Sequence, residues 1–204
     1  MQSDYDYRGL SFSEGRPTLS LNLSYDHASG AYAGASAIGV DTARSGVEML
    51  GYVAYAGYAR RLTRSLSWDV GASNLNMTDF AAEKYTVNYT ELYAGVSSQH
   101  LSAHLHYSPN YLGEGRSSLY ANLDGAVGLG HGWRAFGHVG VLTPLNGAAY
   151  GGGREQRYDF RAGLAAQVKA CELRLAWTNA TPDIYTEAFR RERNAVIVSA
   201  SYSF

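Results

Sequence analysis

The residues whose side chains could take part in binding or catalysis are ionisable, and they alternate with apolar residues along short segments. They fall into two groups by charge. Acidic residues and histidines come from the middle of the chain, namely Asp69, Glu91, His104, His106 and Asp124, whereas the arginines are Arg8, Arg134, Arg161 and Arg174. Because alternate residues of a strand share one face, each group would line one wall of a closed barrel. We take all nine as candidate pore-lining residues.

A lumen with one acidic and one basic wall would carry a transverse field. Such a field orients polar or zwitterionic solutes while water passes. The alternative is that the same groups pair with one another and form a salt-bridged network that fills a narrow barrel.

Two histidines on one polar face invite a metal-site hypothesis. His104 and His106 could bind a metal ion together with Glu91 or Asp124, since imidazole and carboxylate groups are common metal ligands. Histidines in this arrangement are more often plain lumen residues. We therefore expect no metal and no other cofactor.

An outer-membrane hydrolase is the enzymatic alternative. Ser102 with His104 or His106 would supply a nucleophile and a base, but no nucleophile motif such as G-x-S-x-G accompanies them. The glycine run 151–153 is not followed by Lys-Ser/Thr and a helix, so it is not a phosphate loop. The sequence favours a protein that is not an enzyme.

The composition favours a membrane barrel over a soluble domain. Charged residues make up 17% of the 204 residues, below the roughly 25% of soluble domains, and aromatic residues make up 13%. No stretch approaches the ~18 uncharged apolar residues of a membrane helix. A net charge of -1 implies no attraction to nucleic acid, and the lone Cys171 is read as a small turn residue. We expect residues 1–204 to be a single barrel domain without its signal peptide.

A period-two pattern recurs along the whole chain and predicts strands. It is clearest in 18–27 and in the last segment, 194–204, which reads NAVIVSASYSF. The pattern predicts about twelve strands whose connections are alternately short and long. These features indicate an all-β fold, a transmembrane antiparallel up-and-down β-barrel with short periplasmic turns and longer extracellular loops.

Two details of this barrel can be predicted from the pattern. The first strand is expected over 3–9, and the last strand is expected to pair with it and with 172–181. In the segment 47–62, Val53 and Tyr55 are expected on one face with Met49, opposite Tyr52 and Tyr58. An aromatic girdle near the strand ends is expected from Tyr5, Tyr25, Trp68, Trp133, Trp177 and Tyr202.

Three motifs carry a family resemblance. The run SDYDYRGLSFSEGRP (3–17) resembles the N-terminal signature of the TorF-like porin family of Proteobacteria, YSPNYLG (107–113) is similar to a second segment, and Cys171 before Trp177 is similar to a third. The resemblance implies an exported outer-membrane barrel and supplies no cargo or catalytic residues. The alternation that ends in Phe204 also resembles the signal read by the barrel-assembly machinery.

These observations lead to a functional expectation. We expect a channel of the bacterial outer membrane for passive diffusion of small polar solutes or ions; the alternative is a non-conducting barrel with a structural or partner-binding role. The expected partners are outer-membrane lipid and lipopolysaccharide, the assembly machinery and small polar solutes, with no nucleic acid.

Overall fold

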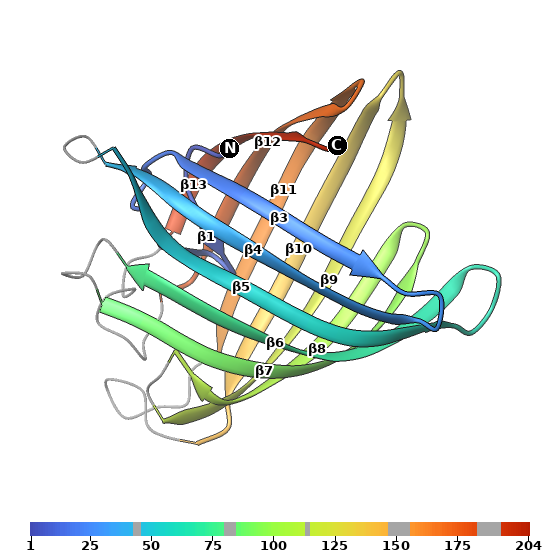
Figure 1. The fold of residues 1–204 in the computed structure, drawn as a ribbon, viewed down its shortest axis with the longest axis horizontal. Helices are drawn as coiled ribbons and strands as arrows, with labels where there is room; N and C mark the ends of the chain where they lie inside the picture. The colour runs from blue at the N-terminus through green and yellow to red at the C-terminus, as the bar shows by residue number, and fades with distance from the viewer. Residues whose placement is uncertain (43–45, 80–84, 113–114, 147–155, 183–192) are drawn as a thin grey trace.

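The fold is one antiparallel sheet whose strands follow one another in chain order (Figure 1). The computed structural model describes residues 1–42, 46–79, 85–112, 115–146, 156–182 and 193–204. Eleven strands form this sheet in the described residues: β3 (Thr18–Asp26), β4 (Ala31–Thr42), β5 (Gly46–Arg61), β6 (Leu66–Asp79), β7 (Tyr85–Ser98), β8 (Leu101–Tyr111), β9 (Arg116–Gly130), β10 (Trp133–Pro144), β11 (Arg157–Val168), β12 (Cys171–Ala180) and β13 (Arg193–Tyr202). A search of these described residues finds no helix with the length and apolar character needed to cross a membrane.

The N-terminal residues close the sheet into a barrel. Gln2 bridges Thr18 of β3 and Ser199 of β13, so residues 1–3 act as a short additional strand between the two edges. The Gln2 N–H donates to the Thr18 carbonyl at 3.0 Å, and the Ser3 N–H donates to the Val198 carbonyl at 2.9 Å. The last strand pairs with β12 over 171–180, which confirms the predicted neighbour.

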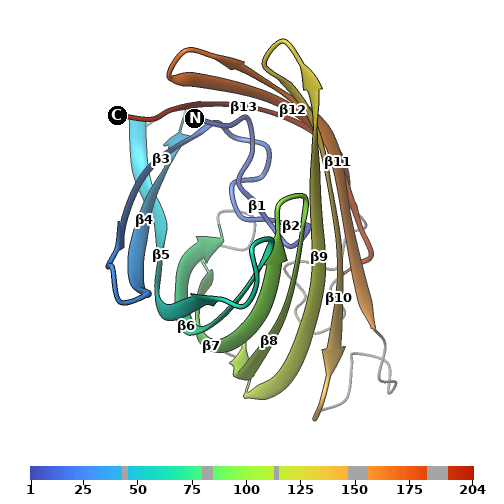
Figure 2. The same ribbon diagram turned by 90° about the vertical axis from the view of Figure 1, so that its right-hand side faces the viewer.

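The prediction of a wall strand over 3–9 is wrong beyond Ser3. From Asp4 the chain enters the barrel, where β1 (Asp6–Tyr7) pairs only with β2 (Leu10–Ser11) through a turn at Arg8 and Gly9 (Figure 2). The physical reason is charge, because this segment alternates Asp and Arg with Tyr and its charged groups find partners inside the barrel. We call residues 4–12 the N-terminal hairpin. Tyr5, expected in the outer girdle, packs with Tyr7 against the interior.

The outer face of the barrel is apolar, as the alternation predicts. In β3 the side chains of Leu19, Leu21, Leu23 and Tyr25 are exposed, and in β13 so are those of Val196, Val198 and Tyr202. The two ends of the barrel differ. Where β3, β5, β7, β9 and β11 end, two to four residues connect each strand to the next, and we call this the turn end. We call the opposite end the loop end. Its connections after β10 and β12 have twelve residues each, and the other three have three to five, so the longest connections all lie at this end as predicted, but those after β4 and β8 are no longer than the turns after β3 and β5.

A β-bulge reverses the facing of half of β5. The register shifts at Ile38 and Gly39 of β4, opposite Leu50, which is fully buried. Because one extra residue exchanges the two faces of a strand, Tyr52 and Tyr58 are exposed on the outside and Tyr55 points inward against Tyr32. The predicted facing of this segment is wrong beyond Met49.

Apolar side chains fill the interior of the barrel at its loop end. Leu10 and Phe12 of the hairpin join a cluster contributed by most of the surrounding strands, namely Ile38, Val40, Leu50, Leu75, Met77, Val87, Tyr89, Tyr111, Leu112, Tyr120 and Leu142. Leu10 is 4% exposed and Phe12 is fully buried. The hairpin is thus held in place by the hydrophobic effect as well as by its charges.

Candidate functional site

The tip of the hairpin carries a buried ion pair with the barrel wall. The two terminal nitrogens of Arg8 donate to the two carboxylate oxygens of Glu91 on β7, at 2.6 and 2.8 Å. The side chains are only 7% and 3% exposed. The guanidinium also lies over the ring of Tyr120, with its central carbon 3.9 Å from the ring centroid. Bidentate geometry and cation–π contact together fix the orientation of the tip.

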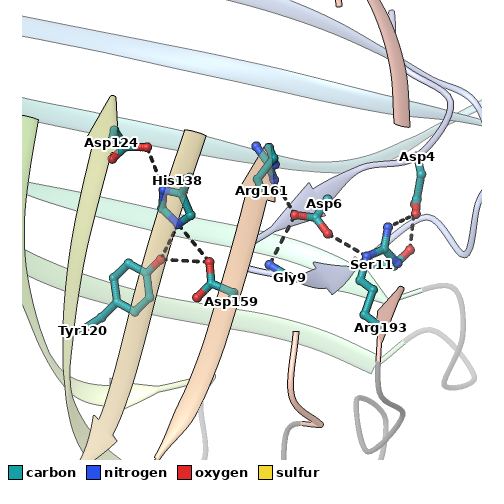
Figure 3. Close-up of polar contacts among 10 residues, drawn as sticks. All are labelled: Asp4, Asp6, Gly9, Ser11, Tyr120, Asp124, His138, Asp159, Arg161 and Arg193. Carbon is teal, nitrogen blue, oxygen red and sulfur yellow. Dashed lines mark hydrogen bonds and ion pairs between the residues drawn. The ribbon is translucent and has the colours of Figure 1, made fainter. Parts of the chain in front are cut away.

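Two further acidic residues tie the hairpin to the opposite wall. Asp6 accepts a hydrogen bond of 2.5 Å from Arg161 on β11, and its second carboxylate oxygen lies 2.7 Å from Nε of Arg193 on β13. Arg193 also donates to Asp4, which accepts from the hydroxyls of Ser11 and Ser13 as well (Figure 3). Three charged residues of one short hairpin therefore have partners on β7, β11 and β13.

The environment of Asp4 favours its charged form. Burial alone would raise the pKa of this carboxyl. The hydrogen bonds from Arg193, Ser11 and Ser13, with the positive charge of Arg193, outweigh burial and hold the pKa below its ordinary value. The ion pair between Asp4 and Arg193 is therefore intact at neutral pH.

A histidine bridges two carboxylates beside the hairpin. His138 Nδ1 lies 2.6 Å from Asp124, and Nε2 lies 2.9 Å from Asp159 and 3.0 Å from the Tyr120 hydroxyl (Figure 3). Since both ring nitrogens face carboxylate oxygens, the doubly protonated ring satisfies both at once. This cluster connects the neighbouring strands β9, β10 and β11 along the inner face of one wall.

Aromatic and imidazole side chains line the other wall. The Tyr32 hydroxyl donates to Asp69 at 3.0 Å and lies 2.8 Å from the Tyr93 hydroxyl, and His104 Nε2 lies 3.2 Å from Asp69. His106 lies in turn beside Tyr93, His104 and Tyr120, with ring centroids 5.6 to 6.0 Å apart. A continuous row of hydroxyl and ring nitrogen groups results.

Glycines of neighbouring strands allow these rings to lie against the wall. A side chain at Gly34, Gly57, Gly71, Gly95, Gly140 or Gly163 would collide with the ring of Tyr55, Tyr32, Tyr93, His104, Tyr120 or Phe136, respectively. Each ring thus covers a position that has no side chain.

We expect Gly95→Ala to destabilise the barrel. A Cβ atom at this position would overlap the His104 ring and displace it from Asp69, at a cost of about 1–3 kcal/mol for overpacking. Gly128→Ala is the matched control, because a Cβ there meets no atom within 4 Å. Urea unfolding of the protein folded in lipid vesicles measures the difference. Equal unfolding free energies in the two variants would contradict this packing argument.

The turn end of the interior holds an accessible charged cluster. Arg134 on β10 and Arg174 on β12 both donate to Glu172, the first at 2.6 Å. Their side chains are 41% and 47% exposed, and that of Asp124 is 45% exposed. Because Glu91, Asp159 and the hairpin carboxylates are almost fully buried, the interior has an accessible half at the turn end and a dry half at the loop end.

The nine candidate residues are distributed over four groups. Arg8, Glu91 and Arg161 contact or belong to the hairpin, Asp69 and His104 join the tyrosine row, and Arg134 and Arg174 share Glu172. Asp124 binds His138, and His106 Nδ1 lies 3.7 Å from Glu91. The carboxylates of Glu172 and Asp159 lie on the arginine side, so that wall carries both signs.

Six charged residues or histidines that form ion pairs in these clusters were not among the candidates. They are Asp4, Asp6, His138, Asp159, Glu172 and Arg193. His138 shares a strand face with Arg134, and Asp159 shares one with Arg161, so strand parity could have found both. Arg193 precedes the predicted last strand (194–204), and nothing in the local sequence marks it as the first residue of β13.

The described residues support neither the metal site nor the hydrolase considered from the sequence. Among them, no three His, Cys, Asp or Glu side chains are grouped so that they could hold a metal ion. The hydrogen bonds of His104 go to Asp69, and Ser102 forms none with either histidine in the described part of the chain.

The architecture identifies the class of protein. An up-and-down barrel with an apolar outer face and a charged interior has the fold of the outer-membrane β-barrels. The fold is similar to the NanC porin (TM-score 0.59, 11% identity, 92% of this chain and 93% of that chain) and to the KdgM porin (TM-score 0.55, 16% identity, 92% of each chain). Within this class, the chain belongs to the bacterial family of unknown function called Gcw_chp, whose match covers residues 1–204. No curated protein sequence matches it.

Proposed function

We propose that the protein is a channel of the bacterial outer membrane for passive diffusion of small polar solutes. The observation that carries this proposal is the accessible half of the interior, where Arg134, Arg174 and Asp124 are close to half exposed inside a porin-like barrel. Charged groups that remain hydrated in the interior are what a polar solute requires along its path. The candidate residues of the two walls would then set orientation and selectivity.

The N-terminal run 3–17 supports a narrower assignment within the same proposal. Its resemblance to the TorF-like porins agrees with the position of this run at the seam and in the interior of the barrel. Outer-membrane lipid and lipopolysaccharide would contact the apolar outer face. The barrel-assembly machinery would read the C-terminal strand that ends in Phe204.

A second candidate function is that of a non-conducting barrel, and the filled loop end favours it. The hairpin and the apolar cluster around Phe12 fill the loop end, and the ion pair of Arg8 with Glu91 is dry. A barrel filled in this way would not conduct, and its role would be structural or partner-binding. The two candidates therefore differ in whether the hairpin ever leaves the interior.

Conductance separates the two candidates. Refolded protein should first show a band that shifts on boiling in a gel, the mark of a folded barrel. Single-channel recording in planar bilayers with a panel of small solutes then tests conduction. We expect conductance from the wild type, increased when the hairpin is released. If a folded barrel conducts in neither form, the channel proposal fails and the non-conducting barrel stands.

We expect the accessible arginines to set ion selectivity. Arg134→Gln combined with Arg174→Gln should change the permeability ratio towards cations by about twofold, the effect of exposed, screened charges. The reversal potential in a salt gradient measures this ratio. Arg60→Gln, at an exposed position of β5 near the turn end, is the control. An unchanged reversal potential would remove the two arginines from the solute path.

A further inference from the structure

Two arginines of the barrel wall are met by carboxylates that do not belong to the wall. Arg161 and Arg193 come from β11 and β13, whereas their partners Asp6 and Asp4 come from the hairpin (Figure 3). Asp6 engages both guanidinium groups and Asp4 engages one. Two carboxylates, two positions apart in the chain, therefore occupy one arginine pair.

These carboxylates can leave without breaking the wall. The two short strands of the hairpin pair only with each other, and no residue from Asp4 to Phe12 takes part in the ladder of β3 to β13 in the described residues. The hairpin is held by side-chain contacts, which can be exchanged for contacts with another molecule. Arg161 and Arg193 belong to β11 and β13, so they remain on the wall when the hairpin leaves.

A solute would reach this pair from the accessible half. The Arg161 side chain is 35% exposed, whereas that of Asp6 is only 2% exposed. Along the sheet, Arg161 lies four residues closer to the loop end than Ala165, which pairs with both Arg134 and Arg174. An anion that enters at the turn end therefore passes the cluster of Arg134 and Arg174 before it meets Arg161.

We propose that Arg161 and Arg193 form a binding site for a solute with two carboxylates, which Asp4 and Asp6 occupy until such a solute displaces them. The inference rests on the proposed channel and names its solute class. Guanidinium groups bind carboxylates with charge-assisted, directional hydrogen bonds, and the present occupants are themselves two carboxylates. A solute that binds only after the hairpin leaves shifts the barrel to the released state by its own binding free energy.

Protection of a buried thiol reports the position of the hairpin. Leu10→Cys in a Cys171→Ser background places the single thiol where the native side chain is 4% exposed, so a water-soluble maleimide reacts only when the hairpin leaves. The probe is succinate, a dicarboxylate. Succinamide is its neutral counterpart of similar size, and sodium chloride at matched ionic strength controls for screening.

We expect succinate to accelerate modification by about tenfold at about ten times its dissociation constant. Succinamide and chloride should not do so. In the Arg161→Gln variant the rate without succinate should rise and the acceleration should disappear. Arg60→Gln should behave like the parent in both respects. A band that shifts on boiling shows for every variant that the barrel is folded.

The outcomes separate this inference from the proposed function. No acceleration by succinate in a barrel that conducts would overturn the site and leave the channel standing. Acceleration in a barrel that never conducts would support the site and remove the channel. Equal acceleration by chloride would mean that screening, not carboxylate recognition, releases the hairpin, and equal acceleration by inorganic phosphate would overturn the restriction to carboxylates.

Discussion

Gly9→Ala is expected to increase conductance through the barrel, whereas Gly15→Ala is expected to leave conductance at the wild-type level. Both glycines have positive φ angles, +71° and +73°, so both variants carry the same kind of backbone strain. Only at Gly9 would the new Cβ overlap another group, the Cβ of Ala180, with Asp159 also 3.1 Å away; a Cβ at Gly15 meets no atom within 4 Å. Comparison of the two variants therefore separates steric displacement of the hairpin from the general effect of an alanine at a positive φ angle.

The expected size of the Gly9→Ala effect follows from the free-energy cost of overpacking. About 1–3 kcal/mol against the seated hairpin changes its seating equilibrium by about five- to 150-fold. We expect a matching rise in open probability in planar bilayers and in the modification rate of Leu10→Cys. Equal behaviour of the two glycine variants would show that the hairpin does not control access to the interior.

Glu91→Met is expected to release the hairpin, because it removes the acidic partner of the buried Arg8 guanidinium. Arg8 would then remain buried without its countercharge, which costs about 3–5 kcal/mol. Arg8→Met leaves Glu91 in the same position and should cost a similar amount. The double variant replaces the ion pair by two apolar side chains of similar volume, and we expect it to recover most of the lost free energy.

A double-mutant cycle on hairpin seating measures this coupling. The modification rate of Leu10→Cys gives the seating free energy of each member, and heat-modifiable migration shows that each barrel has folded. Additive losses in the double variant would mean that Arg8 and Glu91 act independently. In that case the apolar contacts of Leu10 and Phe12, not the ion pair, hold the tip.

The barrel could be predicted from the sequence because its main features are local. Alternation fixes which face of 18–27 or 194–204 is apolar, and the lengths of the connections fix which end is which. The bulge at Leu50 could not be found in this way. Its cause is the packing of Leu50 and Ile38 in the interior, which strand periodicity does not contain.

The sequence does not predict that the hairpin lies inside the barrel, because its residues alternate in the same way as those of a wall strand. Asp4, Asp6 and Arg8 alternate with Tyr5 and Tyr7 as lumen and lipid residues would. What moves them inside is long-range pairing, for example of Arg8 with Glu91, 83 positions away. The candidate residues of the walls could be chosen by parity, but no local pattern tells which carboxylate binds which arginine.

The seam of the barrel has a consequence for its biogenesis. The amino group of Met1 donates to the carbonyl of Ala200, a contact across 199 positions, and contacts of such sequence separation form slowly. Residues 1–3 complete the wall and continue directly into Asp4 and the hairpin. Closure of the cylinder and entry of the hairpin into its interior are therefore coupled through the chain, because the residues that complete the wall are joined directly to the hairpin.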